Sequence, residues 1–64
     1  MGKPGDRVTF WRLQTGMAPQ QGVIYALHET QEGIPYAEIT PDEQPERHVY
    51  LCERAVWGYK VVEQ

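Results

Sequence analysis

Three side chains of this 64-residue chain could take part in chemistry near neutral pH: His28, His48 and Cys52. Histidine exchanges a proton in this range, and a cysteine thiolate is a nucleophile. His48 and Cys52 would share one face of a strand, but their four-residue separation corresponds to about 13 Å along the strand. We therefore expect Cys52 to be a small, half-buried apolar residue. His48 is either a proton donor or general base, or a partly exposed strand residue, and we favour the second interpretation.

The remaining groups give little support for catalysis. The chain has no serine, and its glycines are scattered singly, so it lacks a nucleophilic hydroxyl of that kind and a phosphate-binding loop. The carboxylate pairs Asp42-Glu43 and Glu29/Glu32 fall in polar segments without apolar surroundings that would suit a general acid. One cysteine and two histidines cannot complete a zinc site without carboxylates. We expect no catalytic residue, no metal and no cofactor.

The aromatic side chains suggest a surface that binds another molecule. The chain has seven of them, and a domain this short buries only about 60% of its unfolded surface. The expected binding residues are Trp11, Tyr36, His48, Tyr50, Trp57 and Tyr59. Such a surface suits a proline-rich peptide, a methylated amine or a second copy of the chain. Alternatively, the tyrosines and tryptophans cover the ends of a barrel with their polar tips in water. We favour self-association and expect a homo-oligomer, with a peptide or small-molecule ligand as a further expectation.

The pattern of apolar and turn-forming residues predicts an all-β fold. The longest β-prone run, residues 21–29, is expected to be the central strand. The other expected strands are residues 7–13, 34–40, 47–52 and 56–62. Five short strands separated by turns predict a five-stranded SH3-like barrel. A 3₁₀ turn at residues 53–55 is expected before the last strand. The whole chain, residues 1–64, would form a single domain with a loose lead-in at residues 1–5.

Alternation along the strands predicts which side chains face the core. In the first strand we expect Val8 and Phe10 to point inward. The central strand should place Val23, Tyr25 and Leu27 on one face and Ile24, Ala26 and His28 on the other. The two later strands should place Ala37, Ile39, Val49 and Leu51 inward and Tyr36, Glu38, Thr40, His48, Tyr50 and Cys52 on the opposite face.

Charge and hydropathy narrow the range of partners and locations. The formal net charge is −3, which argues against a general nucleic-acid-binding protein. No apolar run approaches the ~20 residues that span a membrane, and no signal-peptide pattern is present. With a single cysteine, these features lead us to expect a cytoplasmic protein without a disulfide, a membrane partner or a nucleic-acid partner.

Several short motifs add a more specific resemblance. They are Gly5-Asp6-Arg7-Val8, Gln21-Gly22, Glu32-Gly33, Tyr36-Ala37 and Val49-Tyr50. Together they resemble the plasmid-borne type II dihydrofolate reductases. That resemblance implies SH3-like barrels that assemble as homotetramers around one pore, which folate and NADPH share.

The resemblance also implies where an active site would lie. The segment Arg47-His48-Val49-Tyr50 is similar to the Val-Gln-Ile-Tyr strand that lines the family's pore, with His48 in place of glutamine. Phe10 occupies the place of a lysine that attracts the anionic ligands in the family. The alternative function is therefore an NADPH-dependent enzyme with its site near His48 and Tyr50. The two departures favour a non-catalytic binding or self-assembly module.

Overall fold

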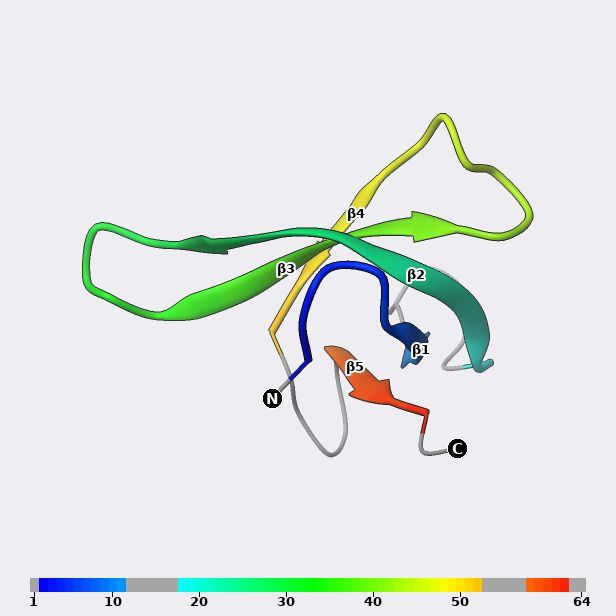
Figure 1. Cartoon of the computed structure of the whole chain (residues 1–64), viewed down its shortest axis with the longest axis horizontal. Helices are drawn as coiled ribbons and strands as arrows, with labels where there is room; N and C mark the ends of the chain where they lie inside the picture. The colour runs from blue at the N-terminus through cyan, green and yellow to red at the C-terminus, as the bar shows by residue number, and fades with distance from the viewer. Residues whose placement is uncertain (1, 12–17, 53–57, 63–64) are drawn as a thin grey trace.

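The protein is an all-β structure built on one antiparallel sheet (Figure 1). This computed structural model describes residues 2–11, 18–52 and 58–62. The strands are β1 (Arg7–Trp11), β2 (Gln20–Glu29), β3 (Pro35–Pro41), β4 (Val49–Leu51) and β5 (Gly58–Val61). They lie in the order β4-β3-β2-β1-β5, which confirms that β2 is the central strand. The described part of the chain contains no helix, and the expected 3₁₀ turn at 53–55 lies outside it.

The sheet is open, with β4 and β5 at its edges. Beyond the strand pairs, the Tyr59 N–H donates a hydrogen bond to the Cys52 carbonyl at 3.2 Å, which connects the chain just after β4 to β5. In Figure 1 the β2–β3 hairpin extends as a long ribbon away from β1 and β5. Gly33 in the turn of this hairpin has φ +85°, a left-handed conformation that glycine adopts without steric cost.

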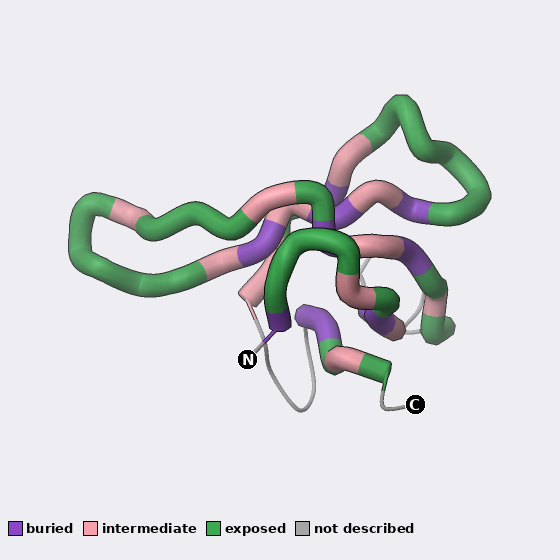
Figure 2. Tube along the Cα trace, viewed as in Figure 1, coloured by how far each residue is buried: buried purple, intermediate pink, exposed green. Residues whose placement is uncertain are grey.

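The core lies where the inward faces of all five strands meet. Its buried members are Val8, Phe10, Ile24, Ala37, Ile39, Val49 and Tyr59. Leu51 and Val61 pack against them. The inward positions predicted on β1, β3 and β4 are confirmed. In Figure 2 the buried segments concentrate where the strands cross, whereas the β2–β3 hairpin is mostly exposed beyond that point.

Tyr59 belongs to this core, although the sequence led us to expect it on a binding surface. Its side chain is only 3% exposed. In the pairing of β1 with β5, Tyr59 lies opposite Phe10, and directly opposed residues of an antiparallel pair project to the same side of the sheet. Because Phe10 points inward, Tyr59 does too.

A β-bulge at Tyr25 changes the face assignment of the central strand. Ile24 pairs with Ile39, whereas Ala26 already pairs with Glu38, so Tyr25 is an extra residue without an opposite partner. One extra residue reverses the inward and outward alternation beyond it. The predicted grouping of Ile24 with Ala26 and His28 was therefore wrong, because Ile24 is buried while His28 lies on the exposed side with Tyr36.

The N-terminal segment is hydrogen bonded to β2, although we expected a loose lead-in. The Gly5 N–H donates to the Ile24 carbonyl, and the Ile24 N–H donates to the Asp6 carbonyl, each at 2.9 Å. A turn closed by the Asp6 N–H and the Lys3 carbonyl, 3.0 Å apart, shapes this segment. The chain before β1 therefore continues the hydrogen bonding along the central strand.

Candidate binding face

The outward side of β2, β3 and β4 carries a cluster of polar and aromatic side chains around Glu38. We call it the Glu38 face; its members are Tyr25, His28, Tyr36, Glu38, Thr40, His48 and Tyr50. The alternation of β3 creates this face, because Ala37 and Ile39 are buried beneath it. Glu38 lies opposite Ala26 of β2 and opposite Tyr50 of β4. Its carboxylate therefore lies between the two strands that flank β3.

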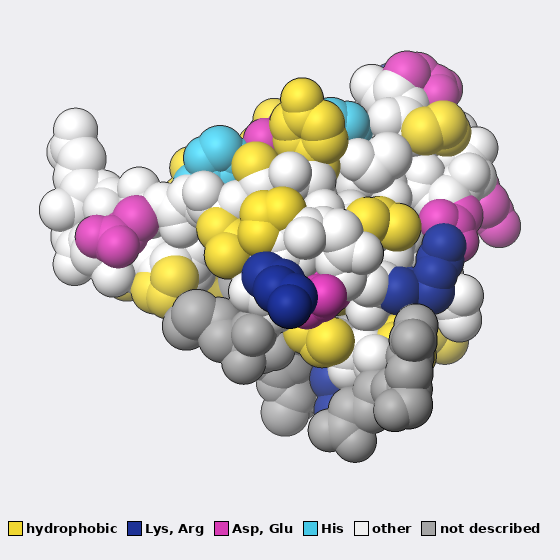
Figure 3. Space-filling model, viewed as in Figure 1, with side chains coloured by type: hydrophobic (Ala, Val, Ile, Leu, Met, Phe, Trp, Pro, Cys, Tyr) yellow, Lys and Arg dark blue, Asp and Glu magenta, His cyan; other side chains and the backbone are white. Residues whose placement is uncertain are grey.

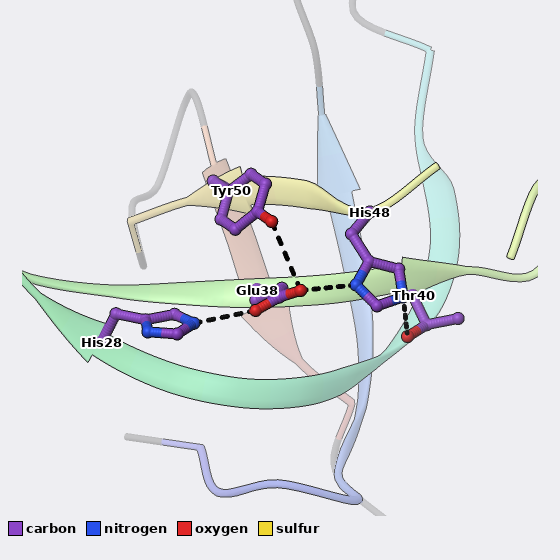
Figure 4. A network of polar contacts seen from close by, with 5 residues as sticks. All are labelled: His28, Glu38, Thr40, His48 and Tyr50. Carbon is purple, nitrogen blue, oxygen red and sulfur yellow. Dashed lines mark hydrogen bonds and ion pairs between the residues drawn. The ribbon is translucent and has the colours of Figure 1, made fainter. Parts of the chain in front are cut away.

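Glu38 accepts hydrogen bonds from three side chains that come from both neighbouring strand regions (Figure 4). His28 Nε2 lies 2.8 Å from Oε1, and His48 Nδ1 lies 2.5 Å from Oε2. The Tyr50 hydroxyl donates to Oε2 at 3.3 Å. With its Nδ1 proton directed at Glu38, a neutral His48 can accept a hydrogen bond from the Thr40 hydroxyl, 3.3 Å from Nε2. The network therefore orients both imidazole rings.

The network keeps Glu38 ionised and Tyr50 protonated. The hydrogen bond from His48, followed by that from His28, lowers the pKa of Glu38 from its ordinary value of 4.5. The negative charge of Glu38 raises the pKa of the Tyr50 phenol. The side chain of Glu38 is only 13% exposed, so the charge is held largely beneath the rings that surround it. The face therefore presents an ionised carboxylate that is surrounded by N–H and O–H donors.

The rings on the Glu38 face also contact one another. His28 stacks on Tyr36 with ring centroids 5.2 Å apart, and Tyr50 lies 6.4 Å from each of these rings. On the other side of Glu38, the Tyr25 and His48 rings are 4.7 Å apart. Tyr25 and Tyr50 remain 62% and 58% exposed. These contacts arrange the five rings in two groups, of which one contains His28, Tyr36 and Tyr50 and the other Tyr25 and His48, with the carboxylate between them.

The charge of this face is negative when its histidines are neutral. The strands β2, β3 and β4 contain no lysine or arginine in their sequences, so they supply no fixed cation to Glu38. The nearest arginine along the chain, Arg47, is exposed in the turn before His48. In Figure 3 the visible histidine side chains lie at the upper margin of the molecule beside hydrophobic ones, whereas the clearly visible lysine and arginine side chains lie lower in the view.

The structure brings together three of the six binding residues expected from the sequence. Tyr36, His48 and Tyr50 lie on the Glu38 face. Trp11 is half-buried at the end of β1, opposite Gly58, and β1 is not one of the three strands that carry this face. Tyr59 is in the core, and Trp57 lies outside the described residues.

The sequence interpretation missed Tyr25, His28 and Glu38 as members of the face. Glu38 was assigned to the same side as Tyr36, and a cross-strand pairing of the predicted strands would have placed it beside Tyr50. Tyr25 points outward because its neighbour Ile24, and not Val23, faces the core. The position of His28 depends on the bulge, for which the sequence contains no clear indication. Cys52 is half-buried, as expected.

Two other features bear on what the molecule could bind. A cavity of about 440 Å³ lies between residues 19–21 and 41–44. Arg7 pairs with Asp42 at its margin, 2.8 Å apart, so part of the negative charge there is already compensated. Among the described residues, no three His, Cys, Asp or Glu side chains are arranged to hold a metal ion, and no helix is long and apolar enough to cross a membrane.

The fold and the Glu38 face define a small all-β protein with an exposed cluster of rings around a carboxylate. Comparison with known proteins adds no relative, since no family model, no curated protein and no solved structure matches the chain.

Proposed function

We propose that the protein is a small non-catalytic binding module whose binding surface is the Glu38 face. The observation that carries the proposal is the exposure of Tyr25 and Tyr50 beside rings that are already oriented by the Glu38 network. Tyrosine offers a large contact area at a small entropic cost, and orientation before binding reduces that cost further. In its finer architecture we take the sheet to be an SH3-like barrel, which the strand order and the Cys52–Tyr59 hydrogen bond support.

The alternative is an NADPH-dependent enzyme of the type II dihydrofolate reductase kind. It requires a polyanionic cofactor to approach His48 and Tyr50. Both residues donate hydrogen bonds to the ionised Glu38, so their donors are occupied and the local charge opposes an anion. We therefore favour non-catalytic binding and take no cofactor to be required. The expected homo-oligomer is a further proposal, in which a second copy covers part of the same face.

The proposal can be tested with a panel of defined probes monitored through backbone amide NMR signals. The probes are a quaternary ammonium ion, NADPH, a proline-rich peptide and the protein itself across a concentration series followed by sedimentation. At least one member should shift signals of residues 25–28, 36–40 and 48–50 and leave Lys60 unchanged. Tyr25→Ser should weaken that interaction by about tenfold or more, since removing a central aromatic contact costs more than about 1 kcal/mol.

Ile34→Ser provides the matched control, because Ile34 is similarly exposed at 47% in the β2–β3 hairpin but is not part of the Glu38 face. Both variants should keep the stability of the parent within about 0.5 kcal/mol, as exposed substitutions usually do. If none of the probes shifts the face and the protein sediments as a monomer throughout, the Glu38 face is not a binding surface. If Ile34→Ser weakens binding as much as Tyr25→Ser does, the binding site lies on the hairpin.

A further inference from the structure

We infer that the ligand of the Glu38 face is a quaternary or alkylated ammonium group. The inference rests on the proposed function and names its ligand class. It starts from the combination of a single carboxylate with several ring faces on one surface. Ring faces attract cations through their quadrupole, and ammonium groups with alkyl substituents lose less hydration on binding than metal ions do.

Charge complementarity selects a cation over an anion or a neutral molecule. Glu38 is the one member of the face that is charged when both histidines are neutral, and its neighbours supply no lysine or arginine from β2, β3 or β4. The Glu38 side chain is 13% exposed. A partly buried charge is screened less by water and salt than an exposed one. An anion would be repelled, and a neutral apolar molecule would gain nothing from Glu38.

The geometry of the rings suits an ion that lies on the surface. Tyr36, His28 and Tyr50 are in mutual contact, with centroid separations of 5.2 and 6.4 Å, so no space for a ligand remains between them. Tyr25 and Tyr50 are exposed on opposite sides of the network. The ligand would therefore lie over the cluster, near Glu38, in contact with exposed ring faces. We expect a dissociation constant in the millimolar range, because a ligand on such a shallow site makes only a few contacts.

Choline and its neutral analogue 3,3-dimethylbutan-1-ol test the inference on the unmodified protein. The two molecules have nearly the same shape and differ in the charge of the head group. Choline should shift the amide signals of residues 25–28, 36–40 and 48–50. The neutral analogue should bind at least about tenfold more weakly, because it lacks one favourable charge interaction. Equal binding of the two molecules would refute the inference.

A pair of substitutions separates local charge from net charge. Glu38→Gln should weaken choline binding about tenfold. Glu43→Gln removes the same charge from an exposed position outside the face and should leave binding unchanged. If both variants lose binding equally, only the net charge matters and the inference fails. If choline has no effect while NADPH, the peptide or self-association shifts the same residues, the face remains a binding surface and the ligand class is wrong. If no probe acts, the proposed function fails as well.

Discussion

Replacing Gly22 with alanine should destabilise the protein, although a rule based on sequence alone predicts the opposite. Glycine weakens the interior of a strand, and a Gly→Ala change at a compatible backbone conformation stabilises a protein by about 0.4–1 kcal/mol through the unfolded state. Gly22 is not among the glycines with positive φ, so its backbone conformation does not exclude alanine. The obstacle is a steric clash with the neighbouring strand β3.

The magnitude follows from the close approach of β3. A Cβ at position 22 would lie 2.5 Å from the Thr40 carbonyl oxygen, 3.0 Å from Ile39 Cγ2 and 3.1 Å from Pro41 Cα. Two of these atoms belong to the backbone, so rotation of a side chain cannot relieve the contact. The strands must separate by about half an ångström to restore even the closest Cβ contact, and overpacking of this kind costs about 1–3 kcal/mol.

After the gain from the unfolded state is subtracted, the middle of the two ranges gives a net loss of about 1.3 kcal/mol. For a domain of this size this corresponds to a decrease in Tm of roughly 5–10 °C. Urea denaturation and thermal unfolding, monitored by tryptophan fluorescence and circular dichroism, would measure it. Gln21→Ala is the matched control, because Gln21 is the exposed neighbour in the same strand, and its stability should change by less than about 0.5 kcal/mol. A Gly22→Ala variant as stable as the parent would show that β2 and β3 do not approach each other as described.

Two further predictions concern the core and the Glu38 network. Phe10→Ala should cost about 3–5 kcal/mol, because Phe10 is fully buried opposite Tyr59; urea titration that showed a loss below about 1 kcal/mol would contradict the core assignment. The lowered pKa of Glu38 means that its contribution to stability is present above the ordinary value of 4.5 and is lost as the pH falls through the lowered value. Glu38→Gln should therefore lose less stability than the parent between about pH 6 and pH 3, and equal losses in both proteins would show that the hydrogen bonds from His28 and His48 do not stabilise the carboxylate.

Several features of the fold depend on local sequence and could be predicted without the structure. Val, Ile and Tyr in residues 21–29 favour a strand, and this segment is the central strand β2. Alternation with a period of two correctly placed Val8 and Phe10 in the core and Tyr50 outside it. Gly33 adopts the left-handed conformation that a hairpin turn requires. These features follow from the backbone preferences of individual residues and from the segregation of apolar side chains.

The composition of the Glu38 face, in contrast, was decided by how the strands pair. The bulge at Tyr25 reverses the alternation beyond it and so brings His28 to the side of Glu38, and no local preference of residues 24–26 specifies an extra residue there. Tyr59 points inward because it opposes Phe10, a contact between residues at opposite ends of the chain. The sequence around Tyr59 does not show whether this tyrosine is buried or exposed, because an amphipathic side chain suits both environments.

The sequence by itself therefore determined the β class, the central strand and the alternation within regular strands, since these depend on contacts between near neighbours. Only the tertiary structure decided that His28 from β2 and His48 from the turn before β4 both reach the Glu38 carboxylate from β3. Ten residues separate Glu38 from each histidine in the chain. The physical reason is register: a shift of one residue in either pairing would turn the histidine away from Glu38 and towards the opposite side of the sheet.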